Sequence, residues 1–434
     1  MGFFSKSSCK VLWYEADSRA IQPGSLFFAL PGQRQDGHDF LQQASEKGAI
    51  AAVVDKSYQG ASFGLELFRV SNVLEALQRL AQELLQERGA RILGVTGSVG
   101  KTTSKEFLWT LLLEKFQAGK TPLNKNTKIS LPLSLLQMQG SEKMVVLEMG
   151  MTQAQEIARL IEIAPPEIAL ITNVALAHAE SFPDGLLGIA KAKMEIFSHA
   201  KTKLGIIPRE LLFYEKELKE SSCPKKTFSL QDPRADFYLE RKGDGFILHE
   251  DKQQSPQFFL PFQETHFIQD TLAALSMARS VGMSYEEIIP RLKELKPPAM
   301  RFEKIEKRGI LFINDCYNAS PLSIQAALSN LPKPKKRGRR IAVLGEMPHL
   351  GAFAEEEYKK VGAYAAEFAD ILLCLGEKCS SMCESFTRQG KTAYLFATHA
   401  ELRQKLDGIV KENDVVLIKG SRAMQMEKIL LDKE

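Results

Sequence analysis

The sequence predicts an α/β protein of three domains, and three observations support this prediction. A chain of 434 residues is too long for one ordinary hydrophobic core and usually forms two to four domains. Apolar strands, glycine turns and helices alternate along most of it, which is typical of parallel sheets covered on both faces. The pattern changes near residue 90, and "LKPPAM" breaks it near residue 300. We therefore expect domains at 1–90, 91–299 and 300–434.

The first domain is predicted to be a small α/β unit. Its strands are "SLFFAL" and "GAIAAVVD", each bounded by turn residues. The segment "NVLEALQRLAQELLQER" places leucines at helical spacing, and Ser71 is a plausible cap in front of it. We expect this helix to lead into the second domain.

The second domain is predicted to contain a parallel sheet. Strand, turn and helix recur as "RILGVTG" with "TTSKEFLWTLLLEKF" and as "KMVVLEMG" with "TQAQEIARLIEIA", followed by the strand "EIALITNV". Between about 225 and 262, "ADFYLE", "GFILHE" and "QFFLPF" predict a small antiparallel insertion, and the helix "DTLAALSMARSVG" follows.

The third domain is predicted to be doubly wound and Rossmann-like. Its strands are "GILFINDCYN", "RRIAVLGEM", "ADILLCLG", "KTAYLF" and "DVVLIKGS", with helical stretches between them. The segment "PKPKKRGRR" carries six basic residues. A solvated loop is the favoured interpretation of this cluster, and a nucleic-acid patch is the alternative.

Composition excludes several classes of protein. The net charge of +4 is mild, so charge alone predicts binding neither to nucleic acid nor to a membrane. No apolar run approaches the roughly 18 residues that a membrane-spanning helix needs. The scattered cysteines fit free thiols in a reducing compartment: Cys9, Cys223, Cys316, Cys374, Cys379 and Cys383. We expect a cytoplasmic protein.

The stretch "GVTGSVGKTTSKEF" predicts a phosphate-binding loop. A strand that runs through glycines into a helix aims several backbone N–H groups at one point, where the helix dipole favours an anion. Gly97 and Gly100 permit the turn, and Lys101 can reach terminal phosphate oxygens. The hydroxyl of Thr102 or Thr103 can bind Mg²⁺.

The spacing of this loop departs from the usual pattern. A glycine is expected at position 95, where the chain has Val95, and Gly94 is one residue away. A generic strand-to-helix turn is the alternative. A lysine followed by two threonines at a helix start favours nucleotide binding, and we include Ser98 in the predicted site.

Two residues after neighbouring strands are candidates for the same site. Glu148 ends the strand "VVLE", and His178 follows the next one in "TNVALAHAE". The carboxyl ends of parallel strands meet at one sheet edge, so both side chains are expected near the phosphate loop. A strand-end glutamate is otherwise often a surface residue, and a lone histidine is more often structural.

Several motifs together resemble one family, the ATP-dependent Mur ligases. They are "DSR" with "PGSLFFALPGQRQDGHDF", "VTGSVGKTTSKE", "LEMG", "ITNVALAH", "IAKAKMEIF", "NDCYNASP", "VLGEM" with "LG", and "LIKGSRAMQME". Each is weak alone, but their order along nearly the whole chain is specific. The resemblance is strongest to the branch that adds D-alanyl-D-alanine.

The resemblance implies an amide-forming reaction with ATP and Mg²⁺. ATP would phosphorylate the carboxylate that ends a UDP-linked muramoyl tripeptide, and the amine of D-alanyl-D-alanine would attack the acyl phosphate. Both substrates are small molecules. The family also suggests a monomer, with no nucleic acid and no membrane span.

The resemblance also assigns roles to residues. On the catalytic side, Lys101 would hold the β and γ phosphates. Thr102 or Thr103 would bind the first Mg²⁺ together with Glu148, and His178 would bind the second. Lys193 would be carbamylated, and Lys191 would be exposed. On the nucleotide side are Arg301, Asp315, Tyr317 and Asn318. The substrate contacts would be Ser18, Arg19 and His38 for UDP, Asn124 and Asn126 in the central domain, and Lys419, Ser421 and Arg422 for the incoming peptide.

Some positions depart from the family pattern. The minor ones are Thr127, Ser130, Met300 and Glu346. The adenine-proximal pattern of His-Asn, two residues and Asn is replaced by His266, Phe267 and, at its end, Asp270. Because an aspartate carboxylate cannot donate a hydrogen bond to the base, we expect weak discrimination between ATP and GTP.

Two other functions fit parts of the sequence. Folylpolyglutamate synthase shares the central and C-terminal plan, but it would leave the UDP-like N-terminal segment unexplained. A non-ligase P-loop NTPase acting on nucleic acid through "PKPKKRGRR" would leave His178, Lys193 and "KGSR" without a role.

Overall fold

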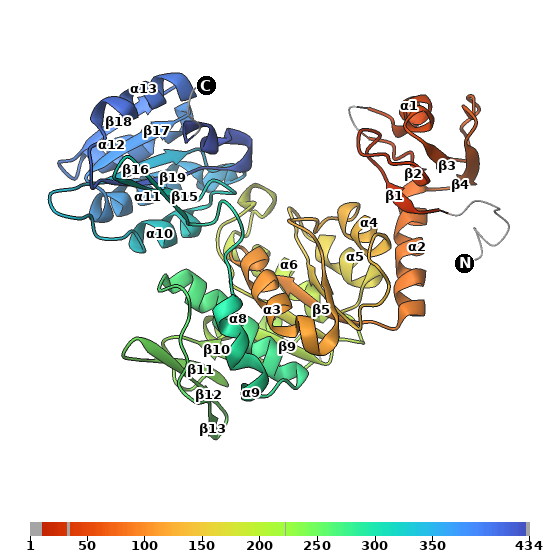
Figure 1. Ribbon diagram of the computed structural model, residues 1–434, viewed down its shortest axis with the longest axis horizontal. Helices are drawn as coiled ribbons and strands as arrows, with labels where there is room; N and C mark the ends of the chain where they lie inside the picture. Colours follow the sequence, from red (N-terminus) through yellow and green to blue (C-terminus); the bar gives the residue numbers. More distant parts are fainter. Residues whose placement is uncertain (1–10, 33–34, 222, 431–434) are drawn as a thin grey trace.

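Three β-sheets organise the computed structural model of the chain, which describes residues 11–32, 35–221 and 223–430. The sheets have four, nine and six strands and follow one another along the sequence, as the predicted three-part α/β class requires. The first and last sheets lie above opposite ends of the central one (Figure 1).

The N-terminal sheet is parallel throughout, in the order β1-β2-β3-β4. Its elements are β1 (Trp13–Glu15), β2 (Ser25–Phe28), α1 (Leu41–Glu46), β3 (Ala49–Asp55), β4 (Glu66–Val70) and α2 (Val73–Arg88). The predicted cap of α2 is one residue off. Asn72, not Ser71, accepts the hydrogen bond from the backbone N–H of Glu75, and Gly89 in the left-handed region ends the helix.

Helix α2 fastens this domain to the central one. It packs along α4 (Ser130–Leu136), and the Arg88 guanidinium donates to the carbonyls of Leu135 and Met138. Gln78 reaches the carbonyl of Lys128 in the same way. The helix stands as the stem of the N-terminal domain in Figure 1. The first domain is therefore joined to the second by packing and not only by the chain.

The central sheet has the order β13-β12-β11-β10-β9-β8-β5-β7-β6, and it is parallel from β6 to β11. Its strands are β5 (Arg91–Thr96), β6 (Ala118–Lys120), β7 (Met144–Glu148), β8 (Ile168–Ile171), β9 (Leu204–Pro208), β10 (Lys225–Ser229), β11 (Phe237–Lys242), β12 (Gly245–Glu250) and β13 (Gln253–Gln254). Its helices are α3 (Lys101–Phe116), α4, α5 (Glu156–Ile163), α6 (Leu186–Met194), α7 (Glu215–Leu218), α8 (Thr265–Val281) and α9 (Tyr285–Ile288).

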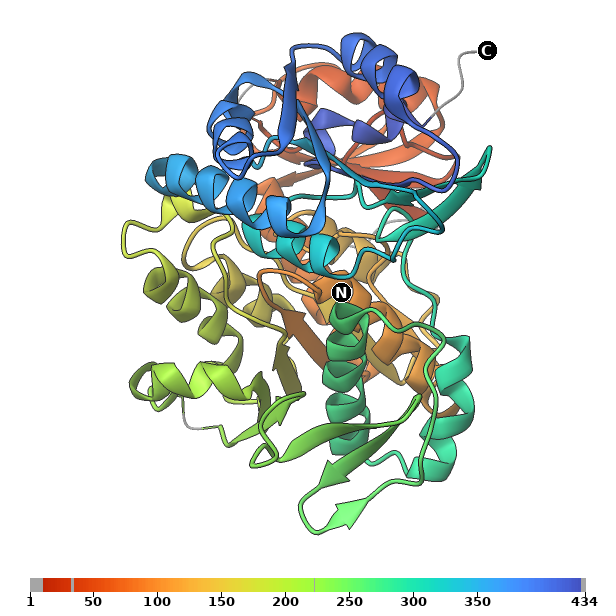
Figure 2. The same cartoon turned by 90° about the vertical axis from the view of Figure 1, so that its left-hand side faces the viewer.

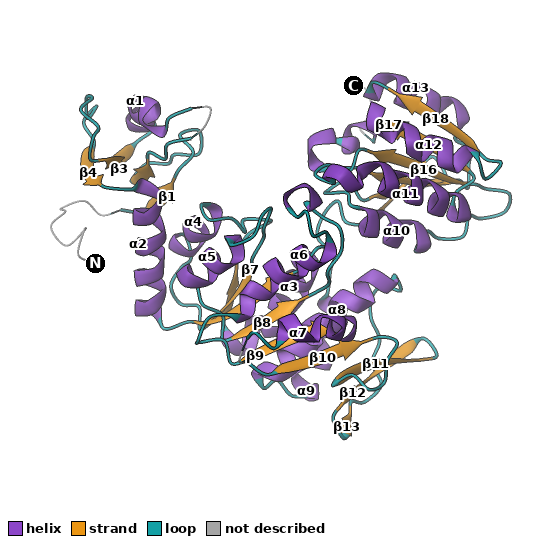
Figure 3. Cartoon of the chain, turned by 180° about the vertical axis from the view of Figure 1, so that it is seen from behind, coloured by secondary structure: helices purple, strands orange, loops and turns teal. Residues whose placement is uncertain are grey.

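Helices cover both faces of this sheet. Apolar residues of α3 and α8 belong to one buried cluster, and those of α4, α5 and α6 belong to another. The strands between them are buried on both sides, which explains their uninterrupted apolar sequences. The layered arrangement is visible from behind in Figure 3.

The predicted antiparallel insertion is part of the central sheet and not a separate unit. β11 and β13 each pair with β12 in antiparallel, but β10 and the start of β11 pair in parallel as Phe228 with Phe237. Only the end of one strand overlaps the start of the next, so a short connection is enough. At this sideways step, between β10 and β11, the chain moves to the neighbouring position in the sheet and extends its edge.

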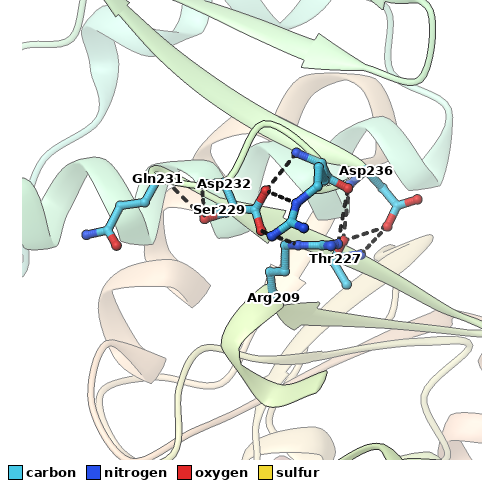
Figure 4. Close-up of polar contacts among 7 residues, drawn as sticks. Arg209, Thr227, Ser229, Gln231, Asp232 and Asp236 are labelled. Carbon is cyan, nitrogen blue, oxygen red and sulfur yellow. Dashed lines mark hydrogen bonds and ion pairs between the residues drawn. The ribbon is translucent and has the colours of Figure 1, made fainter. Parts of the chain in front are cut away.

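Polar side chains fix this sideways step (Figure 4). Asp232 accepts from the guanidinium of Arg209 at 2.6 Å, and Asp236 accepts from the hydroxyl of Thr227 at 2.7 Å. The hydroxyl of Ser229 accepts from the backbone of Asp232. The turn is thus held by three local acceptors.

The C-terminal sheet has the order β14-β15-β19-β16-β17-β18 and is parallel except for the β14–β15 hairpin. Its elements are β14 (Glu303–Lys307), β15 (Ile310–Asn314), α10 (Pro321–Ser329), β16 (Arg340–Gly345), α11 (Ala354–Phe368), β17 (Ile371–Leu375), α12 (Ser380–Thr387), β18 (Thr392–Phe396), α13 (His399–Ile409) and β19 (Val415–Lys419). This is the predicted Rossmann-like arrangement.

The basic segment 332–340 divides into two parts. Arg339 pairs with the buried carboxylate of Asp414 at 2.7 Å, and Arg340 donates to the carbonyls of Leu331 and Pro332. The other four basic residues are exposed: Lys333, Lys335, Lys336 and Arg337. Two of the six cations therefore hold the domain together, which favours the solvated-loop interpretation.

Two further findings concern the described part of the chain. In it, no helix combines the length and the apolar character that crossing a membrane requires. Its cysteines are free thiols, namely Cys223, Cys316, Cys374, Cys379 and Cys383, and Cys9 lies outside the described residues.

Candidate active site

A cavity of about 900 Å³ lies between the central and C-terminal domains. Its central-domain wall includes the loop before α3, the segment between β6 and α4, the segments after β7 and β8, and the start of α8. Its other wall consists of the segments after β15 and β19 with Arg301 and α10. The carboxyl ends of the parallel strands open into this space, where α/β sheets usually bind ligands. In Figure 2 the C-terminal domain stands over this edge of the central sheet.

Two glycines of the loop before α3 are required by its geometry. Gly97 has φ 150°, and a Cβ there would lie 1.9 Å from the hydroxyl of Thr172. Gly100 has φ 83°, and a Cβ would lie 2.2 Å from Oδ1 of Asp270. Val95, at the unusual position, is a buried residue of β5. The departure in spacing thus belongs to the strand, and the turn itself keeps its glycines.

Lys101 begins α3 and folds back over the loop. Its Nζ donates to the carbonyl of Gly97 at 2.7 Å and to that of Ser98 at 3.3 Å. Burial lowers the pKa of Lys101, and the charge of Glu148 opposes this shift. The first N–H groups of a helix have no partner within it, and residues 98–103 all line the cavity. This end of α3 can therefore receive an anion.

Thr102, Glu148 and Asn126 form one corner of the cavity. The hydroxyl of Thr102 donates to Oε2 of Glu148 at 2.8 Å, and the amide of Asn126 donates to Oε1 at 2.7 Å. Neighbouring oxygens around Mg²⁺, bound at 2.0–2.1 Å, lie about 3 Å apart. The oxygens of Thr102 and Glu148 already have this separation and the oxygen chemistry that Mg²⁺ prefers. This corner fits one magnesium ion.

Lys101, His178 and Lys193 form a second corner, where each lysine is close enough to shift the pKa of the histidine. Burial, then the charges of Lys101, His349 and Lys193, lower the pKa of His178 to about 4. Burial and the charge of Lys101 lower the pKa of Lys193 well below its ordinary value, and its side chain is 3% exposed. Lys191, two residues earlier, is exposed as predicted. Because Mg²⁺ prefers oxygen ligands, these nitrogens suit it only if Lys193 carries a carbamate.

Two buried nitrogen atoms in the cavity wall lack a hydrogen-bond partner within the described part of the chain. They are Nε of Arg301 and Nδ1 of His266. Arg301 also donates to the hydroxyl of Thr102 at 2.9 Å and lies over the ring of Tyr317 at 4.3 Å. Burial lowers the pKa of His266 to about 4. Buried polar atoms without partners are costly, so both point to a polar ligand.

The peptide-side residues predicted after β19 line the cavity but differ in their availability. Lys419 is buried, and its Nζ donates to Oδ2 of Asp315 at 2.6 Å and to the carbonyl of Asn318 at 2.9 Å. Ser421 is buried as well, and Arg422 is exposed and pairs with Glu427 at 2.7 Å. Lys419 is thus engaged in fixing Asp315, and Arg422 is the more accessible cation.

The C-terminal domain contacts His178 directly. The imidazole of His349 stacks on that of His178 with ring centres 5.4 Å apart, and its Nδ1 contacts the carboxylate of Glu180. A Cβ on Gly351 would lie 2.7 Å from Cα of Glu180, so the backbones meet closely. Sequence reasoning missed His349, because nothing in "MPHLG" signals a contact with a residue so distant in the chain.

The residues at the predicted adenine pattern lie at the start of α8 and line the cavity, but their side chains have different partners. Phe267 is buried in an aromatic cluster with Phe107, Phe262 and Phe302. Asp270 accepts from the hydroxyl of Ser104 at 3.2 Å. A further residue, Gln269, brings an amide to the cavity that sequence reasoning missed.

The assumption that Asp270 cannot donate is wrong. Burial raises the pKa of Asp270 to about 8, against the opposing hydrogen bond from Ser104 and the charge of Arg301. At neutral pH the side chain is mainly a carboxylic acid, which donates one hydrogen bond where a side-chain amide donates two. Its surroundings include the base of the phosphate loop, since Gly100 is its neighbour.

Three predicted residues lie in the N-terminal domain, outside the cavity wall. The hydroxyl of Ser18 donates to Gln43, and Arg19 is 83% exposed and pairs with Asp17. Both ring nitrogens of His38 are engaged, Nδ1 with Asp36 and Nε2 with the backbone N–H of Asp55. The part of the predicted motif at residues 33–34 lies outside the described residues.

The structure brings most of the other predicted residues to one place. The cavity wall contains Ser98, Gly100, Lys101, Thr102, Thr103, Asn124, Asn126, Glu148, His178, Arg301, Asp315, Tyr317, Asn318, Lys419, Ser421 and Arg422. Gly97 is next to the cavity wall, because its carbonyl accepts a hydrogen bond from Lys101. Lys193 is close enough to the wall for its charge to lower the pKa of His178. Glu346 instead turns toward the backbone of Lys378.

Comparison with protein families covers each of the three parts. Residues 13–92 match the model described as Mur ligase family, catalytic domain. Residues 95–278 match the Mur ligase middle domain, and residues 300–422 match the Mur ligase glutamate ligase domain.

Individual proteins are similar along almost the whole chain. The UDP-N-acetylmuramoyl-tripeptide–D-alanyl-D-alanine ligase of Bacillus subtilis is 33% identical, over 96% of this chain and 92% of its own. The enzyme of the same name from Escherichia coli is 32% identical, over 95% and 92%.

Solved structures agree with these matches. The ADP complex of MurF ligase from Thermotoga maritima is 29% identical with a TM-score of 0.82, covering 98% of this chain and 97% of its own. MurF from Acinetobacter baumannii is 27% identical with a TM-score of 0.85, covering 98% and 93%. A bifunctional folylpolyglutamate synthase from Yersinia pestis, at 17% identity and a TM-score of 0.65 over 82% and 93%, shares the fold alone.

Proposed function

The chain belongs to the Mur ligase family, and we propose that it is the ATP-dependent ligase that joins D-alanyl-D-alanine to UDP-N-acetylmuramoyl tripeptide. The enzyme would act in the synthesis of peptidoglycan precursors, in the cytoplasm and as a monomer. The observation that carries this proposal is the two-domain cavity, in which a phosphate loop faces the Thr102–Glu148 oxygen pair.

The chemistry has two steps. The γ-phosphoryl group of ATP passes to a carboxylate oxygen of the tripeptide, which gives an acyl phosphate and ADP. The amine of D-alanyl-D-alanine then attacks the acyl carbon and loses a proton, the carbon–oxygen bond breaks, and phosphate leaves. A carboxylate is a poor acyl donor, and phosphorylation turns its oxygen into a leaving group.

The first corner serves the nucleotide. Lys101 exchanges the carbonyls of Gly97 and Ser98 for phosphate oxygens, and the N-terminus of α3 adds its N–H groups. Thr102, with Thr103 as the alternative, and Glu148 would hold the first Mg²⁺, which would supply positive charge beside the transferring phosphoryl group. Arg301 reaches from the other domain to the same phosphates, which gives its free Nε a partner.

The second corner serves the carboxylate that is activated. Burial and the charge of Lys101 lower the pKa of Lys193, so its amine is neutral enough to take up carbon dioxide as a carbamate. The carbamate would supply oxygens, and with His178 it would hold the second Mg²⁺. His178 is neutral because its pKa is about 4, so its ring nitrogen can bind a metal across the physiological range.

The remaining residues hold the substrates. Asp315 and Asn318 lie on the nucleotide side, with Asp315 on the ribose and fixed there by Lys419. Arg422 and Ser421 meet the carboxylate of D-alanyl-D-alanine, and the charge of Lys419 contributes to the same field. Asn124 and Asn126 approach the tripeptide, whereas Ser18, Arg19 and His38 belong to the domain that binds the UDP end.

The experiment is an ATP turnover assay with each substrate omitted in turn. We expect ADP and phosphate to form at an appreciable rate only with UDP-muramoyl tripeptide and D-alanyl-D-alanine together, and mass spectrometry to detect the pentapeptide. Replacing both with a folate and glutamate tests the alternative enzyme. Phosphate release that ignores all of these substrates would contradict a ligase.

A further inference from the structure

Lys105 is a buried cation that none of the roles above uses. It lies one turn after Lys101 on α3, on the same side of the helix, and its side chain is 0% exposed. A buried ammonium group is costly unless hydrogen bonds and opposite charges compensate it. The groups that Lys105 contacts therefore indicate which part of the site its ammonium group stabilises.

The ammonium group of Lys105 holds a loop. Its Nζ donates to the carbonyl of Thr121 at 2.7 Å and to the carbonyl of Leu123 at 2.6 Å. Both belong to the segment between β6 and α4, which continues into Asn124 and Asn126 in the cavity wall. One side chain on the nucleotide helix thus fixes the start of the asparagine loop.

This loop has a conformation that requires such a restraint. Leu123 has φ 49°, in the left-handed region that a residue with a Cβ rarely adopts, and the residue is 69% exposed. Packing of the leucine therefore does not hold the turn. Lys105 binds the carbonyl of this same residue, and strained backbone persists where its surroundings determine it.

Lys105 also acts on the carboxylate at the end of β7. Its Nζ lies 3.9 Å from Oε2 of Glu148 and 3.3 Å from Oε1 of Glu106. Thr121, whose carbonyl Lys105 binds, accepts the backbone N–H of Glu148 with its hydroxyl. On the far side, Glu106 pairs with Lys120. Loop and carboxylate are thus tied to the same cation.

We propose that Lys105 is a positioning residue, which holds the loop of Asn124 and Asn126 and the carboxylate of Glu148 in the arrangement that receives the substrates. The identity of those substrates rests on the proposed function, but the positioning itself does not. Lys105 touches neither substrate and acts only through these neighbours.

The test compares Lys105→Met and Lys105→Gln with Lys120→Met as the matched control. Lys120 belongs to the same ionic network through Glu106, but it binds neither loop carbonyl nor Glu148. Hydrogen exchange of the substrate-free chain reads the loop directly. We expect faster exchange at residues 121–127 in both Lys105 variants, greater for Met than for Gln, and near-normal exchange there in the control.

Kinetics separates positioning from simple loss of folded protein. We expect the KM for the UDP-linked substrate to rise and kcat/KM to fall about 10–100-fold in Lys105→Gln, as for other residues that orient ligands. A fall in kcat at unchanged KM, or native exchange at 121–127 in both variants, would overturn the proposal.

Two provisions keep the test decisive. If Lys105→Met does not fold, Lys105→Gln carries the test, because its amide can still donate to one carbonyl. Without any variant, the wild-type amides of residues 123–126 should exchange more slowly than their exposure suggests, and fast exchange there contradicts a held loop. If the wild-type chain turns over no UDP-linked substrate, the proposed function fails while the exchange experiment still decides the role of Lys105.

Discussion

The two corners of the cavity differ in how completely the protein itself supplies hydrogen bonds and opposite charges to their polar groups. At the corner of Thr102, Glu148 and Asn126, both carboxylate oxygens accept hydrogen bonds and a buried lysine stands nearby. At the corner of Lys101, His178 and Lys193, burial and the charge of Lys101 lower the pKa of both other bases, and the charge of Lys193 lowers that of His178 further. The first corner is complete when the chain has folded.

The difference indicates which kind of ligand each corner binds. Positive charges brought together without a counter-charge are relieved either by losing protons or by gaining an anion. A carbamate on Lys193 would supply negative charge at the second corner, and the phosphates of ATP would supply it to Lys101, which the two corners share. The first corner is thus a preformed site for a cation, and the second becomes functional with anions from outside the chain.

Lys101→Ala is the change expected to have the largest effect, because it removes the cation that serves both corners. We expect kcat to fall about 10³-fold, as when a main source of transition-state stabilisation is lost. The fold should survive, since Gly97 and Gly100 set the turn. Steady-state kinetics and thermal unfolding check both statements.

The same variant tests the charge coupling at the second corner. Because the charge of Lys101 lowers the pKa of His178, its removal should raise that pKa from about 4 toward the ordinary value. Titration of the imidazole by NMR measures the shift. An unchanged titration would mean that the two side chains do not influence one another.

Lys193→Ala is expected to have the next largest effect, because it removes the group that becomes an anion. We expect a loss of about 10²-fold in kcat, and partial rescue by short carboxylic acids that can occupy the space of the carbamate. Lys191→Ala, at an exposed position on the same helix, is the control and should keep normal activity. Full activity of Lys193→Ala without any added acid would remove the distinction between the corners.

Asp270→Asn sharpens the comparison of the two corners, because it changes a buried side chain that lies next to Gly100 of the phosphate loop. The folded pKa of Asp270 is about 8, above its ordinary value of 3.8. Between these values only the folded state binds the proton, so the free energy of unfolding falls as the pH rises through this window. Asparagine cannot titrate and should remove this dependence.

Thermal unfolding from pH 5 to pH 9 measures the effect of that substitution. We expect the melting temperature of the wild type to fall more than that of Asp270→Asn, and the variant to be the more stable of the two at pH 9. Parallel curves for the two proteins would place Asp270 in a more solvated setting than the structure does.

The smallest expected effect concerns the nucleotide base. Phe267 is buried in the aromatic cluster, so it offers no amide to adenine. We expect kcat/KM for GTP to lie within about tenfold of the value for ATP, because without this amide the site lacks roughly one hydrogen bond that would favour adenine over guanine. Competition between the two nucleotides in one assay gives the ratio directly, and strict dependence on ATP would assign base recognition to another residue, such as Gln269.

Local chemistry explains why much of this site could be predicted from the sequence. Gly97, Gly100 and Lys101 lie in one stretch whose backbone requirements are visible in the residues themselves. Glu148 and His178 follow apolar strands, and parallel strands bring their carboxyl ends to one edge.

Tertiary environment explains what the sequence did not reveal. His349 reaches His178 from another domain, and the buried partners of Lys105 are set by the packing of a loop against a helix. Asp270 was taken as a charged acceptor because only burial raises its pKa, and burial is invisible in the residue type. The edge hairpin was predicted as antiparallel, but its junction with the parallel sheet depends on a two-residue register.

The most direct test of the account follows an oxygen atom through the reaction. The central claim is that this cavity brings the γ-phosphate of ATP to the tripeptide carboxylate. With that carboxylate labelled with ¹⁸O, the phosphate released in each turnover should carry one labelled oxygen, because the acyl carbon–oxygen bond is the one that breaks. Unlabelled phosphate from a reaction that still forms the amide would contradict the claim.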